Sequence, residues 1–307
     1  MSHYLCLLPL AFGISISLLG AQGKSLNPKS LSRPKPQVWN DYWRQGKAEL
    51  TRFALEQSRY GETRKGDAVQ IFVVEDFRTD KQVKAEKPRP DAVPVMKLNF
   101  TRKFLTGIYP YSAMTSVFTP LALKPGPGTL KLSCSVQEWC GQVWLQLNMR
   151  EAAYRLIGHS YYEAEGEEKR EFPLVHLEDG IWNRVRIAPW TLPVGSFKAA
   201  AGALFSRLRH EPLAPVKALG QLVVHSLASS SAPRILAYTV KMPSLRRSLQ
   251  IRFQGRFPFR IVGFRESLPN GRRNVGVATH RELIAYWRHK DAAGALLRKR
   301  LGLDPKR

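Results

Sequence analysis

Residues that could carry metal or nucleophilic chemistry are present, but they are not spaced in a familiar catalytic pattern. The histidines show no HxH, HExxH or similar spacing; they are His3, His159, His176, His210, His225, His280 and His289. His176-Leu177-Glu178 matches half of the zinc-deaminase signature, but the P-C-x-x-C half does not follow. The sequence also lacks a GxSxG elbow, a Walker loop and a GxGxxG fingerprint. We therefore expect no metal site, no cofactor and no catalytic residue, and we favour a binding protein over an enzyme.

Two short groups of residues could bind a ligand. Tyr60, Glu62 and Arg64 lie beside a tight turn, where Arg64 could hold an anionic group. The alternative is a hairpin whose exposed face pairs its own charges. Tyr109 and Tyr111 flank a proline and could line the mouth of a ligand site, or could pack a loop onto a sheet.

Positive charge is the strongest compositional signal. The 307 residues include 48 Lys and Arg against 24 Asp and Glu, which gives a net charge of +24. Arginines are dense after residue 240, and Arg252, Arg256 and Arg260 are candidate members of a basic face. Such a face would attract an anionic lipid or an acidic glycan. The alternative is a chain that is basic without any particular partner.

The N-terminus predicts export. Residues 5–19 form an uncharged apolar run that is short for a bilayer span, and small residues precede Lys24. We expect residues 1–23 to be a signal peptide, residues 24–38 a basic linker, and the mature protein to be periplasmic or secreted, where nucleic acid is an unfavoured partner. The alternative is a membrane anchor formed by residues 5–19, because the segment that follows the apolar run is basic.

Export would leave Cys134 and Cys140 in a compartment that permits disulfides. In one straight strand these residues would lie about 20 Å apart, beyond the reach of a disulfide. If the chain reverses between them, they could face each other across a hairpin. The apolar alternation shifts from even to odd positions here, which favours a reversal or bulge. A disulfide and free thiols remain as alternatives.

Alternating apolar runs and frequent turn signals predict a mainly β fold of the β-rich α+β kind. Residues 68–74 predict a strand, and the Asp-Gly pair at 179–180 predicts a hairpin followed by a strand over 184–187. Thr279 and Glu282 predict a capping box at the start of a C-terminal helix. We expect one domain over residues 39–268, a large curved antiparallel sheet or partial barrel with a few packed helices. A basic helical extension is expected over residues 269–307.

Five stretches carry a family resemblance: WNDYWRQGKAEL, QSRYGETRKGDAVQIFVVEDF, LTGIYPYSAMTSVFTP, SVQEWCGQVWLQLN and FPFRIVGFRES. They resemble a family of exported bacterial proteins of unknown activity that are often labelled "septum formation inhibitor Maf". The resemblance covers residues 39–267 and implies export, but it supplies no catalytic residues. Members of the family are frequently lipoproteins, whereas this sequence has Gln22 where a lipobox needs cysteine.

Genuine Maf proteins are cytoplasmic nucleotide pyrophosphatases with a loop that resembles L-A-S-x-S-P-R-R. Residues 227–234 read LASSSAPR, which is similar but contains an inserted Ala232. The loop also lies too close to the C-terminus for the fold of that enzyme to follow it. We interpret the match as chance.

These observations predict an exported envelope protein without catalysis that binds an anionic or amphipathic component through a basic face. A hydrolase, including a nucleotide pyrophosphatase, is one alternative. A structural envelope protein without a ligand is the other.

Overall fold

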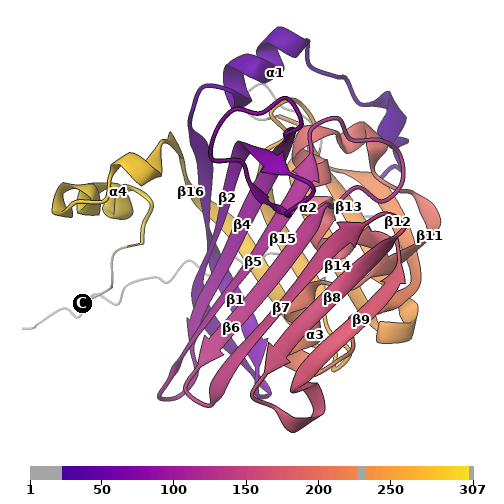
Figure 1. The fold of residues 1–307 in the computed structure, drawn as a ribbon, viewed down its shortest axis with the longest axis vertical. Coiled ribbons are helices and arrows are strands. Elements are labelled where there is room, and N and C mark those ends of the chain that lie inside the picture. Colours follow the sequence, from indigo (N-terminus) through magenta and orange to yellow (C-terminus); the bar gives the residue numbers. More distant parts are fainter. Residues whose placement is uncertain (1–22, 227–232, 304–307) are drawn as a thin grey trace, which may run out of the picture.

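A large curved sheet runs through the protein (Figure 1). The structure is a computed structural model that describes residues 23–226 and 233–303. Residues 1–22 of the predicted signal peptide and residues 227–232 of the Maf-like loop lie outside the described residues. The sheet has 16 strands, and its neighbours are antiparallel except for β10 and β11. The mainly β, curved antiparallel fold predicted from the sequence is therefore confirmed.

The sheet follows the chain as two meanders joined at one seam. The first meander contains β10 (His176–Leu177), β11 (Gly195–Ala200), β12 (Pro215–Ser226), β13 (Ile235–Met242), β14 (Arg247–Gln254), β15 (Ile261–Ser267) and β16 (Arg273–Ile284). The second contains β1 (Ala48–Arg59), β2 (Glu62–Arg78), β4 (Val93–Leu105), β5 (Pro110–Pro120), β6 (Lys131–Glu138), β7 (Gly141–Arg150), β8 (Ala153–Ser160) and β9 (Glu167–Pro173), with the short β3 (Val83–Lys84) beside β2. β1 pairs with β16 and joins the meanders. The edge strands β9 and β10 do not pair with each other, so the sheet is not closed.

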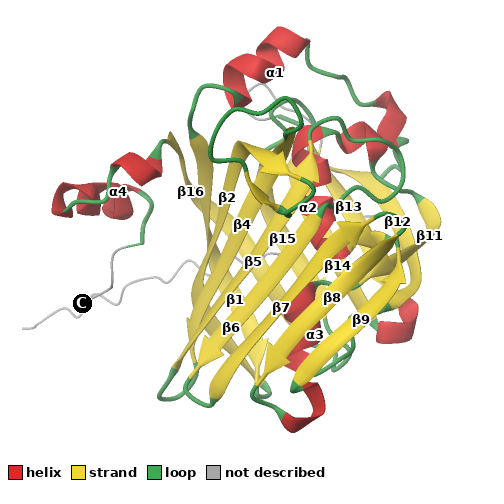
Figure 2. Cartoon of the chain, viewed as in Figure 1, coloured by secondary structure: helices red, strands yellow, loops and turns green. Residues whose placement is uncertain are grey.

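Helices lie inside the curve of the sheet and around its margins (Figure 2). α2 (Glu178–Ile187) packs against β4 and β5, and α3 (Ala203–Arg209) packs against β5 and β6. α1 (Pro36–Trp43) covers one end of the sheet, and α4 (Ala295–Arg300) lies beside it. Short 3₁₀ helices span Pro28–Ser30, Glu163–Glu165, Pro189–Thr191, Pro243–Leu245, Tyr286–Arg288 and Ala292–Gly294.

The two ends of the sheet differ. The hairpin end is formed by the tight turns at residues 60–61, 106–109, 139–140, 161–166, 243–246 and 268–272. The opposite end, which α1 covers, is the cap end. α2 runs from the hairpin end, where it follows β10, toward the cap end.

The core fills the space between the sheet and α2. Burial alternates residue by residue along β14, as expected for a strand with one face inward. Trp182 of α2 packs edge-on against Phe100 and Phe264, at centroid distances of 5.2 and 5.5 Å. Gly276 leaves room for Phe264, since a Cβ at that position would come within 2.0 Å of its ring.

Two predicted elements are wrong. Residues 178–187 form α2 instead of a hairpin and a strand, and all ten residues of this helix are buried. Residues 273–284 form β16 instead of part of a C-terminal helix, because they pair with β1 and β15. The predicted domain boundary at residue 268 consequently falls within the β15–β16 hairpin, and the helical elements described after β16 are two short 3₁₀ helices and α4.

The predicted linker at residues 24–38 packs against the body of the protein. Ser25 forms an isolated bridge with Val223, Leu31 is buried, and the Arg33 guanidinium lies 5.3 Å from the centre of the Trp190 ring. α1 already begins at Pro36.

Candidate functional site

Three tyrosines that the sequence singled out in two separate groups meet at the hairpin end. The hydroxyls of Tyr60 and Tyr111 lie 2.7 Å apart, and the Tyr109 hydroxyl donates to Tyr60 at 3.4 Å. Tyr60 belongs to the β1–β2 turn, whereas Tyr109 and Tyr111 belong to the β4–β5 turn and the start of β5. Pairing of β2 with β4 brings these turns together.

The turn that holds Tyr60 has an unusual backbone. Arg59 pairs with Glu62, which leaves Tyr60 and Gly61 as a two-residue loop with φ of 52° and 77°. Positive φ at both positions is typical of the hairpin turn that matches strand twist. A tyrosine in this region costs roughly 1 kcal/mol or more relative to glycine. Its contacts with Tyr109 and Tyr111 compensate part of that cost.

Arg59 completes the tyrosine group, and sequence reasoning missed it. Its guanidinium donates to the Tyr111 hydroxyl at 3.1 Å and to the Leu208 carbonyl, and lies 4.4 Å from the centre of the Tyr60 ring. Burial alone would raise the pKa of Tyr60, but hydrogen bonds from Tyr109, Tyr111 and Arg59 lower it overall. The Tyr60 oxygen thus has three polar neighbours, Arg59, Tyr109 and Tyr111.

A cavity of about 90 Å³ leads from Tyr60 into the protein, between the sheet and α3. The charged residues that line it are the arginines Arg59, Arg102, Arg209 and Arg247 and one acid, Glu266. Apolar lining comes from Leu204, Phe205, Leu208 and Leu268. A cavity of about 150 Å³ can accept benzene, so this one is large enough for a carboxylate or phosphate group but not for a whole amphiphile.

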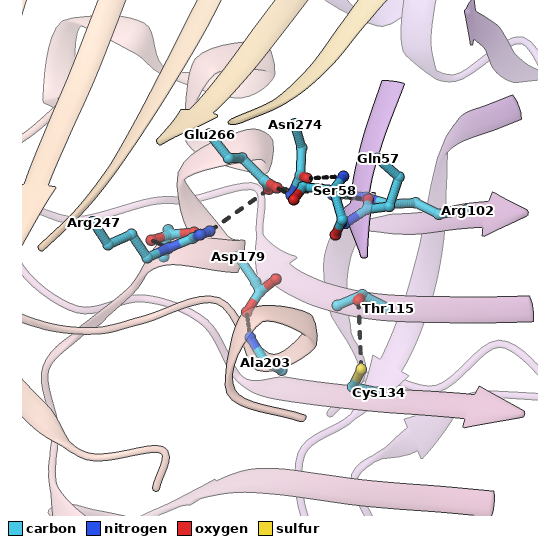
Figure 3. Close-up of polar contacts among 11 residues, drawn as sticks. Gln57, Ser58, Arg102, Thr115, Cys134, Asp179, Ala203, Arg247, Glu266 and Asn274 are labelled. Carbon is cyan, nitrogen blue, oxygen red and sulfur yellow. Dashed lines mark hydrogen bonds and ion pairs between the residues drawn. The ribbon is translucent and has the colours of Figure 1, made fainter. Parts of the chain in front are cut away.

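The inner wall of the cavity is a buried ion-pair network (Figure 3). Glu266 lies between two arginines: it accepts from Arg102 at 2.8 and 2.9 Å and lies 3.6 Å from Arg247. The Asn274 amide donates to Glu266 at 2.6 Å. Burial would raise the pKa of Glu266, but the two arginines and Asn274 lower it to about 2. Glu266 is therefore ionised at neutral pH.

Arg247 is the member of this network with unused hydrogen-bonding capacity. Its Nε and Nη2 atoms donate to Glu178 of α2, and its side chain is 2% exposed. Its Nη1 atom is buried and has no hydrogen-bond partner among residues 23–226 and 233–303. A buried charged donor without a partner costs about 1–3 kcal/mol or more. The wall of the cavity thus offers a guanidinium N–H for which an anion would be a suitable acceptor.

A second carboxylate in this region, that of Asp179, has a pKa close to neutral pH. Asp179 is buried beside Glu178, and its Oδ2 atom accepts the Ala203 backbone N–H of α3 at 2.8 Å (Figure 3). Burial raises the pKa of Asp179 to about 7, and Glu178 adds to the rise. The hydrogen bond from Ala203 and the charges of Arg247 and Arg102 oppose it.

The remaining predicted binding residues are not brought into this site. Glu62 and Arg64 form a surface ion pair of 2.9 Å, which fits the alternative of a hairpin whose exposed face pairs its own charges. Arg256 is exposed in the β14–β15 loop at the cap end, and Arg260 lies 5.9 Å from the Tyr42 ring near α1. Arg252 lies mid-strand on β14, beside Gly263. Arg252 therefore lies within β14, whereas Arg256 and Arg260 lie in the loop that joins β14 to β15.

Of the two alternatives left open for Cys134 and Cys140, the structure has free thiols, and the chain reverses between them as expected. β6 and β7 form a hairpin whose turn contains Cys140, while Cys134 lies within β6 opposite Leu145. Both cysteines are free. The Cys134 thiol is buried 3.8 Å from the Thr115 hydroxyl, and burial raises its pKa to about 12.

Within residues 23–226 and 233–303, no three His, Cys, Asp or Glu side chains are grouped so that they could hold a metal ion. In the same part of the chain, no helix has the length and apolar character needed to cross a membrane.

Comparisons with known proteins find a structural likeness. No family model matches the sequence, and no curated protein matches it. Among solved structures, the chain is similar to the crystal structure of a beta-barrel-like protein of the domain of unknown function DUF1849 from Brucella abortus. The TM-score is 0.45 and the sequence identity 7%, over 77% of this chain and 98% of that chain.

Proposed function

We propose that this protein is a non-catalytic binding protein of the bacterial envelope that takes an anionic, amphipathic molecule at the hairpin end. The observation that carries the proposal is Arg247, whose side chain lines the cavity and whose buried Nη1 atom has no hydrogen-bond partner in the described chain. Arg59 and Arg209 line the same cavity, and no salt bridge within the described residues joins either to a carboxylate. An acidic group would satisfy donors from several arginines at once.

The apolar lining suggests how the rest of the ligand is held. The cavity accepts only the head of the molecule, so a hydrocarbon part would extend past Leu208 and Leu268 toward the tyrosine group. Ligand sites of this kind combine apolar walls with a few polar groups that fix orientation. The proposal therefore moves the anion from the basic face predicted from the sequence to an enclosed position at one end of the sheet.

Titration calorimetry with short, soluble amphiphiles tests the proposal. We expect octyl phosphate and octanoate to bind and the uncharged octyl glucoside not to bind. Replacing Arg209 by glutamine should weaken octyl phosphate binding roughly tenfold to hundredfold, because a charge-assisted hydrogen bond contributes about 1.5–3 kcal/mol. Binding should also weaken as salt is added.

Arg256→Gln is the matched control, since Arg256 is an exposed arginine at the opposite end. It should leave the affinity unchanged. A loss of affinity in Arg256→Gln but not in Arg209→Gln would favour the dispersed surface arginines and contradict the cavity. Hydrolysis of nucleoside triphosphates with Mg²⁺, abolished by Ser229→Ala or Arg234→Ala, would favour the alternative of a hydrolase.

The envelope location is a separate part of the proposal. It rests on the apolar run at residues 5–19 and the small residues that precede Lys24. Mass spectrometry of the native protein should give a mature N-terminus near Lys24. Recovery of the intact chain from the cytosol would contradict export.

A further inference from the structure

Exposed apolar side chains are concentrated on the turns of the hairpin end. The exposed fractions are 56% for Tyr60, 62% for Leu105, 82% for Ile108, 71% for Trp139 and 79% for Tyr161. Single exposed apolar residues are ordinary on a protein surface, whereas a group of large ones at one place marks an interaction site. We call these five residues the apolar tips.

The apolar tips come from four hairpins that are neighbours in the sheet. The β1–β2, β4–β5, β6–β7 and β8–β9 turns follow one another in the strand order, so their tips form a row along the sheet margin. Tyr109 and Trp139 of adjacent turns stack with ring centroids 6.1 Å apart. The row is thus held by the sheet beneath it.

Charged groups around the apolar tips are mixed but include free cations. Lys103, Arg272 and Arg273 are exposed near this end, and no salt bridge in the described part of the chain joins them to an acid. Two of the acids here are already paired, Glu62 with Arg64 and Glu165 with His210. Glu163 and Glu167 remain exposed at the β8–β9 turn.

We infer that the hairpin end docks on a lipid bilayer that contains anionic headgroups, with the apolar tips inserted at the interface. Tyrosine and tryptophan favour this depth because an apolar ring and a polar edge fit the boundary between headgroups and acyl chains. Leu105 and Ile108 supply apolar area, and the unpaired cations complement anionic headgroups. The cavity mouth at Tyr60 lies in the same surface, but docking does not depend on whether the cavity binds a ligand.

Vesicle binding tests the inference directly. We expect the full chain to sediment with vesicles of phosphatidylcholine and phosphatidylglycerol in a 4:1 ratio, and less with phosphatidylcholine alone. The double variant Ile108→Asp/Trp139→Asp should reduce binding at least tenfold, because it places charge where apolar side chains insert. Leu296→Asp is the matched control: Leu296 is as exposed as Trp139, 71%, but lies on α4 away from the hairpins, so binding should not change.

Depth-dependent quenching provides a readout that does not rely on a destabilising change. Lipids brominated near the headgroup should quench tryptophan fluorescence of the wild type more than that of Trp139→Phe. Equal quenching in the two proteins, or vesicle binding unaffected by the double variant, would overturn the inference. Concentration-dependent dimerisation that the double variant abolishes, without vesicle binding, would also overturn it and assign the surface to a second copy of the chain.

The two binding events can fail separately. Arg209→Gln should lose octyl phosphate binding and keep vesicle binding, whereas Ile108→Asp/Trp139→Asp should do the reverse. If either variant lost both octyl phosphate binding and vesicle binding, docking and the cavity would not be separate.

Discussion

Buried ion pairs fix α2 to the sheet at both ends, and the arginines of the two pairs differ in their remaining hydrogen bonds. At the cap end, Arg186 donates to both oxygens of Glu49 at 2.6 and 2.9 Å and to the Pro258 carbonyl at 3.1 Å. At the hairpin end, Arg247 donates to both oxygens of Glu178 but leaves its Nη1 atom without a partner in the described chain.

The surroundings of the two arginines explain this difference. The Arg186 guanidinium lies 4.9 and 4.8 Å from the Trp43 and Phe72 ring centres, and α1 covers this end. Arg247 faces the Phe205 ring at 4.2 Å but also lines the cavity that leads to Tyr60. The buried Arg186–Glu49 pair, which aromatic rings cover, therefore has a structural role. We propose that the Arg247–Glu178 pair, which borders a cavity, also takes part in ligand binding.

The largest expected effect lies at the sealed end. Arg186→Met should lower the free energy of unfolding by about 3–5 kcal/mol, because Glu49 would remain buried without its bidentate partner, with only the Tyr42 hydroxyl and the more distant Arg281 beside it. Urea denaturation followed by circular dichroism measures this. The double variant Glu49→Leu/Arg186→Met should recover much of the loss, since it removes both charges. A loss below about 1 kcal/mol in the single variant would contradict a structural role for the pair.

A pH-dependent effect should appear at the hairpin end. The pKa of Asp179 is about 7 in the folded protein, against about 3.9 in an unfolded chain. Below pH 4 both states hold the proton; between pH 4 and 7 the unfolded state releases it first, so the contribution of Asp179 to stability falls as the pH rises. Above pH 7 the loss is complete and on the order of 4 kcal/mol.

Asp179→Asn should remove this pH dependence, because asparagine does not titrate and its side-chain oxygen can still accept the Ala203 N–H. Urea midpoints at pH 5 and pH 8 would show it: the variant should gain more stability relative to the wild type at pH 8 than at pH 5. An equal change at both pH values would mean that Asp179 does not titrate in this range.

The smallest effect on folding is expected for the cavity arginine used to test binding. Arg209 is only partly buried, and no salt bridge in the described residues includes it, so Arg209→Gln should change the free energy of unfolding by less than about 1 kcal/mol. The same urea experiment measures this change. If Arg209→Gln lowered the free energy of unfolding as much as Arg186→Met, Arg209 would have a structural role like that of Arg186. There would then be no basis for a ligand at the hairpin end.

Local patterns predicted the strands and several members of the site. Turn residues and alternation predicted the β1–β2 hairpin and the β6–β7 reversal, and Tyr60, Tyr109 and Tyr111 were singled out within their own turns. Their meeting could not be predicted, because it depends on the pairing of β2 with β4. α2 was missed because it is buried on every side although its sequence includes charged residues, so no apolar stripe opposite an exposed polar face marks it as a helix, and its Asp-Gly pair is typical of a turn.

The ion-pair network could not be predicted from local patterns, since Arg102 and Glu266 are 164 residues apart. The sequence nevertheless contains a signal that Arg102 and Glu266 are buried. Arg102 stands between Phe100 and Phe104, and Glu266 between Phe264 and Leu268, at positions that share one strand face. A charged residue on an otherwise apolar face indicates a buried charge that requires an opposite partner.

The seam between β1 and β16 has a consequence for how the molecule reaches its native state. Nearly all other strand pairs are hairpins or near neighbours in sequence, whereas this pair joins residues 48–56 to residues 275–284. Contacts of such wide sequence separation slow folding, because the chain loses the entropy of a long loop before it gains them. The last strand must be available before the first is fully paired, so completion of the sheet depends on the C-terminal part of the chain.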